Sequence, residues 1–254
     1  MNVVAIVQAR LSSLRLPKKI LMKVKDHTVI ELLLKRLSKS KKINRLVVAT
    51  TINEEDLELC DFLHNINTLY YRGSENNVLK RFYECAVKFN ADIIVRITGD
   101  CPLVDPEVVD KCIELFLSSN VDYTCNRNPA TFPDGLDVEV FSFKVLEKIN
   151  FLNLNDYEKE HVTPYIYQSN KFKINTLKSE DDFSFLRLTI DEAIDFQVLK
   201  QIIDYFYPNI YFNLEQIIKL YKKFPQIFEK NKLIMRNEGA LMSKSSKLWK
   251  RAKE

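Results

Sequence analysis

The chain has 254 residues, and its 38 lysines and arginines against 34 aspartates and glutamates give a net charge of +4. This small excess is scattered, which argues against a nucleic-acid-binding protein, and no apolar stretch approaches the roughly 20 residues of a membrane-spanning helix. The opening residues lack the basic start and apolar run of a signal peptide. We therefore expect a cytoplasmic protein, with no membrane partner, whose five cysteines are reduced and buried.

Short apolar runs alternate with amphipathic segments along the first half of the chain. The expected strands are 3–7, 45–49, 67–71, 92–97 and 121–125, and the expected helices are 29–38, 54–64, 76–89 and 106–117. In the second half we expect strands at 137–141, 171–177 and 186–190, and helices at 143–150, 158–169, 192–205 and 214–224. Pro106, with Asp105 before it, is typical of a helix start. The alternation predicts an α/β protein, with a single mostly parallel mixed sheet flanked by helices on both faces.

The loop after the first strand is strongly cationic. Residues 8–19 hold two arginines, two adjacent lysines and two serines. The carboxyl end of a first parallel strand is where α/β proteins bind polyanions. Arginine offers forked donors and lysine a point charge, and both suit phosphate oxygens. A solvated basic surface loop is the plain alternative.

Two later strands are followed directly by carboxylates. Asp100 follows Gly99 after the strand at 92–97, and Asp191 follows the strand at 186–190. Mg²⁺ prefers one or two carboxylates together with substrate phosphate oxygens, so these two residues are candidate ligands. Asp191 is also placed to cap the next helix, and Asp195, one turn further on, is expected at the surface.

Five motifs, at 9–19, 71–75, 96–103, 132–140 and 160–165, occur in an order that resembles the cytidylyltransferases of CMP-sialic acid and CMP-KDO synthesis. The resemblance is strongest to the branch named for spore coat polysaccharide biosynthesis, and it covers about residues 1–225. It implies a nucleotide-diphospho-sugar-transferase (GT-A-like) fold. It also implies Mg²⁺-dependent transfer of CMP from CTP to an acidic sugar, or to a sugar- or polyol-derived acid or phosphate, with release of pyrophosphate.

The same resemblance assigns roles to individual residues. It places the nucleotide at Ala9, Arg10, Ser13, Arg15, Lys19, Arg72, Ser74, Asn77 and Gly99, with Arg72 and Ser74 at the cytosine base and Asn77 nearby. It places the acceptor at Asp137, Glu139, Glu160 and His161, and Mg²⁺ at Asp100 and Asp191. Arg10, Arg15, Lys19 and Asp100 are the implied catalytic residues. His161 is a candidate general base, with an acceptor-binding or structural role as the alternative. Many relatives have glycine at Lys18, so we expect a different local turn or an added phosphate contact there.

The composition changes after about Lys232, so we expect a catalytic domain over 1–231 and a linker or tail over 232–254. Residues 248–252 resemble the opening of class III, PLP-dependent aminotransferases, which suggests a fused domain; a C-terminal helix that packs Trp249 is the alternative. Relatives often dimerise, so we expect a homodimer.

Two other functions remain open. A glycosyltransferase of the same fold would typically carry Asp-x-Asp where this chain has Thr98-Gly99-Asp100. A non-catalytic module of a larger biosynthetic protein would not need the charged residues that this chain retains.

Overall fold

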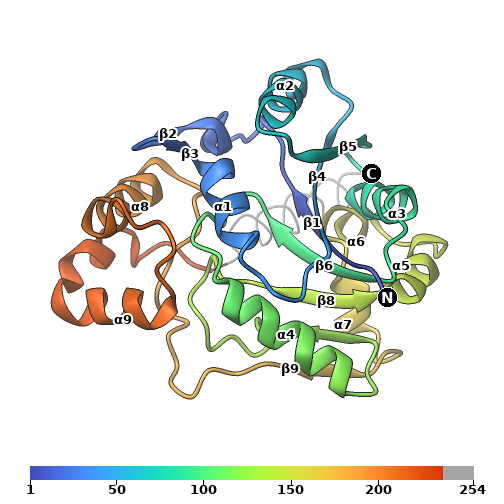
Figure 1. The fold of residues 1–254 in the computed structure, drawn as a ribbon. Coiled ribbons are helices and arrows are strands. Elements are labelled where there is room, and N and C mark those ends of the chain that lie inside the picture. The colour runs from blue at the N-terminus through green and yellow to red at the C-terminus, as the bar shows by residue number, and fades with distance from the viewer. Residues whose placement is uncertain (237–254) are drawn as a thin grey trace, which may run out of the picture.

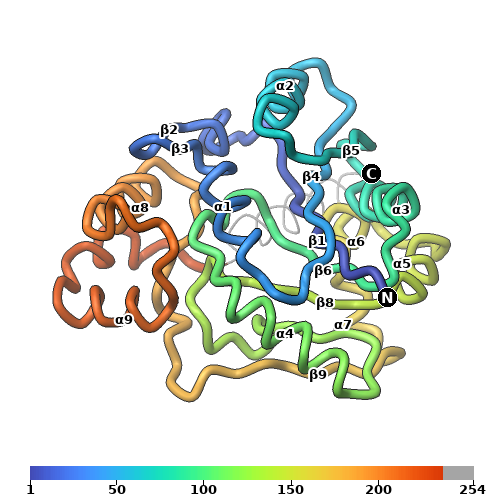
Figure 2. Tube along the Cα trace, in the orientation of Figure 1, coloured from blue at the N-terminus to red at the C-terminus, as the bar shows by residue number. Residues whose placement is uncertain are grey.

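A seven-stranded sheet forms the centre of the molecule, and the computed structural model describes it within residues 1–236 (Figures 1 and 2). The strand order is β5-β4-β1-β6-β8-β7-β9. The strands are β1 (Val3–Gln8), β4 (Arg45–Thr51), β5 (Leu69–Gly73), β6 (Ile93–Thr98), β7 (Tyr123–Cys125), β8 (Glu139–Ser142) and β9 (Ile174–Thr176). β8 runs antiparallel to both of its neighbours, and the other pairings are parallel. The predicted mostly parallel mixed sheet is confirmed.

Helices cover both faces of this sheet (Figure 1). On one face α1 (Val29–Leu37), α2 (Leu57–Asn65) and α4 (Pro106–Ser118) bury their apolar sides, and on the other lie α3 (Val78–Lys88), α5 (Phe143–Asn150), α6 (Asp156–His161) and α7 (Pro164–Gln168). Alternate residues of β1 point to opposite faces, so Ala5 joins the first core and Ile6 the second. Both residues are fully buried.

A third apolar cluster extends the fold beyond the sheet. It contains α8 (Ala193–Phe206), α9 (Leu214–Lys223) and the 3-10 helix Pro225–Asn231, packed against one side of α1. Arg36 fixes this layer, because its buried guanidinium donates to the backbone carbonyls of Leu103, Val104, Ile210 and Phe212. Within residues 1–236, no helix is long and apolar enough to cross a membrane.

Most of the expected elements are present with shifted ends, and the start of α4 is confirmed because Asp105 accepts a hydrogen bond from Glu107 N. The single helix expected over 158–169 is wrong: α6 ends at His161, Val162 takes a left-handed φ of 70°, and Pro164 begins α7. The chain therefore turns at Val162, and Thr163 is the N-cap of α7. The hairpin of β2 (Lys23–Val24) and β3 (His27–Thr28) was not predicted, because two-residue strands carry no periodic signal.

The strand expected at 186–190 is also wrong. Leu188 N donates to Asp134 O, and Ile190 N donates to Asp100 O, so the segment changes backbone partner within two residues. Only one isolated parallel bridge, between Asp134 and Arg187, results. The five cysteines are free and buried, as predicted. Residues 237–254, which include Trp249 and the segment that resembles an aminotransferase, lie outside the described part of the chain.

Candidate active site

A cavity of about 1060 Å³ opens where the carboxyl ends of β1 and β6 meet. Twelve of the predicted site residues line it: Ala9, Arg10, Ser13, Arg15, Lys19, Gly99, Asp100, Asp137, Glu139, Glu160, His161 and Asp191. Arg72, Ser74 and Asn77 do not line it. The structure therefore brings the cationic loop, both strand-end carboxylates and the predicted acceptor residues to one place.

The register of the two central strands sets the floor of this cavity. Gln8 pairs with Thr98, so Ala9 and Gly99 leave the sheet side by side. Gly99 N donates to Gln8 O at 2.8 Å. A β-carbon at position 99 would lie 2.9 Å from Ala9 Cβ and 3.0 Å from Gln8 O, which is too close. Glycine at this position thus allows the two loops to approach.

Lys19 joins the two predicted metal ligands. Its Nζ lies 2.8 Å from Asp100 Oδ2, 2.9 Å from Asp191 Oδ1 and 2.6 Å from Ile190 O. Burial disfavours the charged forms of both partners, but the ion pair outweighs it. The pKa of Asp100 falls to about 2, and that of Lys19 rises above its ordinary value. The two carboxylates therefore converge on one point, which an ammonium group occupies here.

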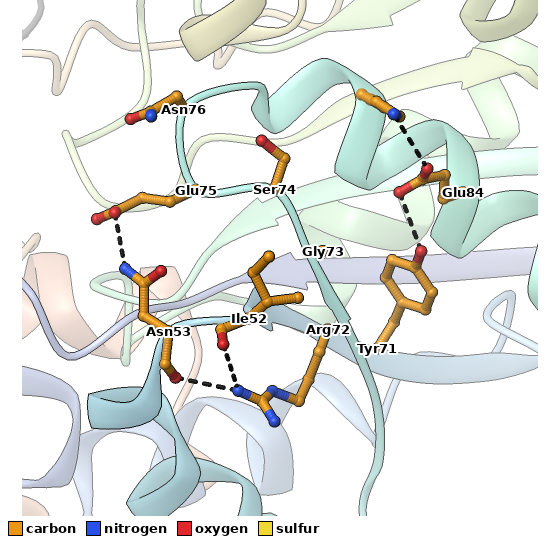
Figure 3. A pocket seen from close by; sticks show the side chains of 10 residues that line it. Ile52, Asn53, Tyr71, Arg72, Gly73, Ser74, Glu75, Asn76 and Glu84 are labelled. Carbon is orange, nitrogen blue, oxygen red and sulfur yellow. Dashed lines mark hydrogen bonds and ion pairs between the residues drawn. The ribbon is translucent and has the colours of Figure 1, made fainter.

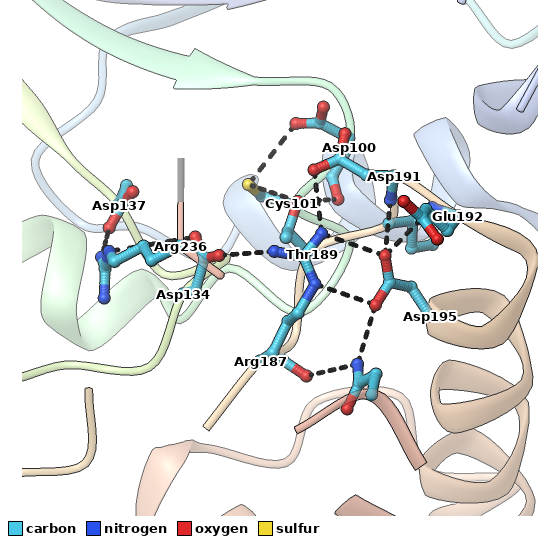
Figure 4. Close-up of polar contacts among 12 residues, drawn as sticks. Asp100, Cys101, Asp134, Asp137, Arg187, Thr189, Asp191, Glu192, Asp195 and Arg236 are labelled. Atoms are coloured by element: carbon cyan, nitrogen blue, oxygen red, sulfur yellow. Dashed lines mark hydrogen bonds and ion pairs between the residues drawn. The ribbon is translucent and has the colours of Figure 1, made fainter. Parts of the chain in front are cut away.

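Two arginines also contact Asp191, and Figure 4 shows one of them, Arg187. Arg15 Nη2 lies 3.0 Å from Asp191 Oδ1, and Arg187 Nη2 donates to Asp191 Oδ2 at 3.0 Å. Arg187 is buried and also pairs with Asp134 at 2.8 Å and Asp195 at 2.9 Å. Sequence analysis did not select Arg187, because nothing in the local pattern connects it with Asp134, 53 residues away.

The prediction that Asp195 lies at the surface is wrong. Asp195 is 2% exposed. It accepts hydrogen bonds from Arg187 and Asn231, and from the backbone N–H groups of Asp191 and Glu192. Glu192, and not Asp191, is the N-cap of α8. Asp195 thereby holds the backbone of Asp191 in place. It is a buried residue that positions a candidate metal ligand, and not the surface residue that we expected.

A glycine places Asp191 beside Asp100. Leu188 N donates to Asp134 O at 2.7 Å and Ile190 N to Asp100 O at 2.8 Å. Gly135, next to Asp134, has φ 101°, and a β-carbon there would lie 2.4 Å from Thr189 N. Only glycine tolerates both this backbone angle and this close approach.

The backbone of the cationic loop (residues 8–19) is held by the buried side chain of Asp56. Asp56, fully buried, accepts a hydrogen bond from Leu11 N at 2.7 Å. Arg10 reaches across the mouth of the cavity to Glu75, with 3.0 Å between Nη1 and Oε1. Lys18 has a left-handed φ of 54°, a conformation that glycine favours. Its ammonium lies 2.5 Å from Glu58, and Lys18 does not line the cavity.

Glu139 lies deep at the predicted acceptor end of the cavity. It is 2% exposed and pairs with Arg96. The hydroxyls of Tyr123 and Thr163 each donate to its Oε1 at 2.5 Å. Burial alone would raise its pKa, but Arg96, Arg127 and these hydroxyls lower it to about 2. Glu139 is thus an ionised, well-bonded centre that connects β8 with β6, β7 and the start of α7.

The other predicted acceptor residues lie closer to the opening. Asp137 pairs with Arg236, whose Nη1 also donates to Phe132 O at 2.9 Å (Figure 4). Glu160 and His161 end α6 and line the cavity. The His161 ring lies 4.6 Å from the Tyr157 ring, centroid to centroid. The acceptor end therefore combines carboxylates with arginine and histidine.

Of the three residues predicted for the base, Arg72 and Ser74 line a neighbouring pocket and Asn77 does not. Arg72 donates to the carbonyls of Thr51, Ile52 and Asn53 at 3.0, 2.7 and 3.0 Å. Figure 3 shows the bonds to Ile52 and Asn53. The side chain of Asn77 caps α3, and Ser74 Oγ accepts from Asn77 N at 3.1 Å. Arg72 and Ser74 line a pocket of about 450 Å³, which shares Glu75 and Asn76 with the main cavity. These two shared residues form the wall between the two spaces.

The fold and the cavity define a nucleotidyltransferase. A sequence model of the cytidylyltransferase family matches residues 4–240, so this chain belongs to that family. The chain is 41% identical over 230 residues to an uncharacterized protein of Methanocaldococcus jannaschii, across 89% of this chain and 93% of that one. It is 33% identical over 207 residues to the spore coat polysaccharide biosynthesis protein SpsF of Bacillus subtilis, across 78% and 85% of the two chains.

Solved structures agree with this assignment. A cytidylyltransferase from Leptospira borgpetersenii superposes with a TM-score of 0.86 at 36% identity, covering 90% of this chain and 97% of the other. A CMP-2-keto-3-deoxy-manno-octonic acid synthetase, solved in complex with CTP, superposes with a TM-score of 0.63 over 81% and 99% of the chains. At 14% identity the second likeness shows the fold alone.

Proposed function

We propose that this enzyme transfers CMP from CTP to an acidic sugar, or to a sugar- or polyol-derived acid or phosphate, and releases pyrophosphate. The observation that carries the proposal is the convergence of Arg15, Lys19, Asp100 and Asp191 on the floor of one cavity. The similarity to a spore coat polysaccharide biosynthesis protein supports a role in surface polysaccharide or glycan synthesis.

The residues present fit Mg²⁺. Asp100 and Asp191 both lie within 2.9 Å of a single nitrogen, so their oxygens converge on a position that favours a cation. Two carboxylates are what Mg²⁺ uses beside phosphate oxygens, and the described residues contain no larger cluster of histidine, cysteine or acidic side chains that could hold a metal. Mg²⁺ bound by Asp100 and Asp191 would supply Lewis-acid polarisation of the α-phosphoryl group.

The reaction needs positioning and charge neutralisation more than covalent chemistry. An acceptor oxygen attacks the α-phosphorus of CTP, the new P–O bond forms, and the bond to the bridging oxygen of the β-phosphate breaks. The positive charges of Arg10, Arg15 and Lys19 stabilise the negative charge that develops on the departing pyrophosphate. Lys19 exchanges its carboxylate partners for phosphate oxygens when the nucleotide binds.

The acceptor lies at the end of the cavity lined by Asp137, Glu160 and His161. The two carboxylates can accept hydrogen bonds from sugar hydroxyls, and His161 adds an imidazole. His161 is placed either to accept the proton of an attacking hydroxyl or to orient the acceptor. A homodimer remains a prediction, and analytical ultracentrifugation of the full chain tests it.

The activity is tested by a screen with Mg²⁺ present. CTP, UTP, ATP and GTP are each combined with a panel of acidic sugars and phosphorylated acids, and pyrophosphate is measured. We expect pyrophosphate from CTP with at least one acceptor. Asp100→Asn should abolish this release while the circular dichroism spectrum is unchanged. Wild-type rates in Asp100→Asn would contradict the metal assignment, and release of a nucleoside diphosphate from a sugar nucleotide would favour a glycosyltransferase.

A further inference from the structure

The two carboxylate oxygens of Asp191 have different partners. Oδ1 contacts two cations that line the cavity, Lys19 Nζ at 2.9 Å and Arg15 Nη2 at 3.0 Å. Oδ2 accepts a hydrogen bond from Arg187 Nη2 at 3.0 Å (Figure 4). Lysine and arginine in the cavity can exchange a carboxylate for phosphate oxygens when a nucleotide binds. Nucleotide binding therefore frees Oδ1 and leaves Oδ2 with Arg187.

Arg187 is fixed in its position beside Asp191. Its side chain is 5% exposed. Nε and Nη2 donate to the two oxygens of Asp195 at 2.9 and 3.1 Å, and Nη1 donates to Asp134 Oδ2 at 2.8 Å. Asn231 Nδ2 donates to Arg187 O at 3.2 Å and to Asp195 Oδ1 at 2.8 Å. Breaking a buried ion pair leaves an uncompensated charge, so the guanidinium keeps its place and Oδ2 stays occupied.

The backbone of Asp191 is held by the same group of residues. Its N–H donates to Asp195 Oδ2 at 2.9 Å, and Ile190 N donates to Asp100 O at 2.8 Å. These bonds fix the distance between the segment that carries Asp191 and the loop that carries Asp100. The carboxylate of Asp191 is thus held at both its backbone and its second oxygen, and it offers one oxygen, Oδ1, to a cation.

The number of oxygens that a carboxylate offers affects which cation it suits. This step rests on the proposed function, which places Mg²⁺ at Asp100 and Asp191. Mg²⁺ demands near-ideal octahedral geometry and is bound through one or two carboxylates beside phosphate oxygens. Ca²⁺ is larger, accepts more ligands and also uses carboxylates through both oxygens. A carboxylate limited to one oxygen suits Mg²⁺ and withholds a ligand from Ca²⁺.

We infer that Arg187 sets the cation selectivity of the site, by holding Asp191 Oδ2 so that the carboxylate binds a metal through Oδ1 alone. Arg187 is a positioning residue, because it acts through Asp191 and does not touch the cation. It disfavours Ca²⁺ relative to Mg²⁺ and Mn²⁺. Partners that orient a metal ligand in this way change metal affinity by roughly 10–100-fold when they are removed.

Electron paramagnetic resonance of Mn²⁺ tests the inference without an acceptor. The full chain is held in excess over CTP, and bound Mn²⁺ is displaced by Mg²⁺ in one titration and by Ca²⁺ in another. The ratio of the two midpoints measures selectivity, and a change of local charge that acts on both cations cancels in it. Wild-type protein should need more Ca²⁺ than Mg²⁺. In Arg187→Gln the ratio of Ca²⁺ to Mg²⁺ midpoints should fall about tenfold or more.

Asp134→Asn is the matched control. It removes a different carboxylate partner of the same guanidinium and leaves the contact with Asp191 Oδ2, so it should keep the wild-type ratio. The double variant Arg187→Gln/Asp134→Asn protects the test against misfolding, because it removes a cation and an anion together and so limits the buried charge imbalance. It should show the same fall as Arg187→Gln. Circular dichroism checks that each variant is folded.

The possible outcomes separate the inference from the proposed function. An unchanged ratio in a folded variant that lacks Arg187, or an equal fall in Asp134→Asn, overturns the inference. A wild-type protein that does not distinguish Ca²⁺ from Mg²⁺ also overturns it. Mn²⁺ bound no more tightly by the complex than by free CTP contradicts the metal assignment, and a chain that does not bind CTP contradicts the proposed function itself.

Discussion

Lys19 and Asp100, 81 residues apart in the chain, form an ion pair with 2.8 Å between Nζ and Oδ2 on the floor of the cavity. The same ammonium contacts Asp191 at 2.9 Å. The lysine expected to bind phosphate thus lies at the point on which both candidate metal ligands converge. Its charge lies between two half-buried carboxylates, and a divalent cation can take this position only when Lys19 moves away.

Replacing Lys19 should therefore strengthen binding of a divalent cation by the free enzyme. Without the ammonium, Asp100 and Asp191 lose a counter-charge at less than 3 Å, and we expect Lys19→Met to bind Mn²⁺ roughly tenfold more tightly or better in the absence of nucleotide. Electron paramagnetic resonance of Mn²⁺ measures this affinity. Lys18→Met is the matched control, because Lys18 pairs with Glu58 outside the cavity. Equal affinities in all three proteins would contradict this explanation.

Glu139 should contribute strongly to stability. Glu139→Gln leaves Arg96 buried without its counter-charge, so we expect the free energy of unfolding at pH 7 to fall by about 3–5 kcal/mol. Urea denaturation measures the change. A loss below about 1 kcal/mol would show that the ion pair contributes little.

The same carboxylate should make stability depend on pH. The pKa of Glu139 is about 2 in the folded protein and about 4.3 in an unfolded chain. Because the folded value is the lower one, the contribution is complete above about pH 4.3 and is lost as the pH falls toward 2. Wild-type protein should therefore lose more stability over this interval than Glu139→Gln. Parallel urea titrations at several pH values measure the difference, and identical slopes would contradict the prediction.

Gly135→Ala should lower both the stability of the protein and its affinity for nucleotide. The added carbon would meet Thr189 N at 2.4 Å, at a φ of 101°. We expect the free energy of unfolding to fall by about 3 kcal/mol or more. We also expect nucleotide binding to weaken, because the segment that carries Asp191 is displaced. Thermal denaturation and CTP titration measure the two effects. A change within about 0.5 kcal/mol would mean that the backbone approach is not required.

Glu75→Gln should release Arg10. Glu75 holds Arg10 at 3.0 Å across the mouth of the cavity, and burial of the pair is partial. An ion pair of this kind contributes up to about 1 kcal/mol, so we expect CTP to bind a few-fold more tightly when the acid is neutralised. Calorimetric titration at low salt measures the gain. Weaker binding in Glu75→Gln would indicate instead that Glu75 itself contacts the ligand.

The sequence predicted the residues that line the cavity better than the buried residues that hold them in position. Asp100 could be chosen because it follows a buried strand at the carboxyl edge of the sheet. Asp191 was chosen on a strand that does not form, and it reaches Asp100 because Ile190 N donates to Asp100 O. Asp195 could not be placed correctly, because its burial depends on Arg187 and Asn231, which reach it through tertiary folding. The roles assigned to Arg72, Ser74 and Asn77 remain predictions.

The most direct test of the central claim follows the α-phosphate of CTP. The enzyme is incubated with Mg²⁺, the acceptor panel and CTP labelled at that phosphorus, and products are separated. We predict that the label appears on an acceptor in the same amount as the pyrophosphate released, and that Asp100→Asn transfers none. Label that remains in CTP with every acceptor, or a transfer that proceeds with UTP or ATP in preference to CTP, would contradict it.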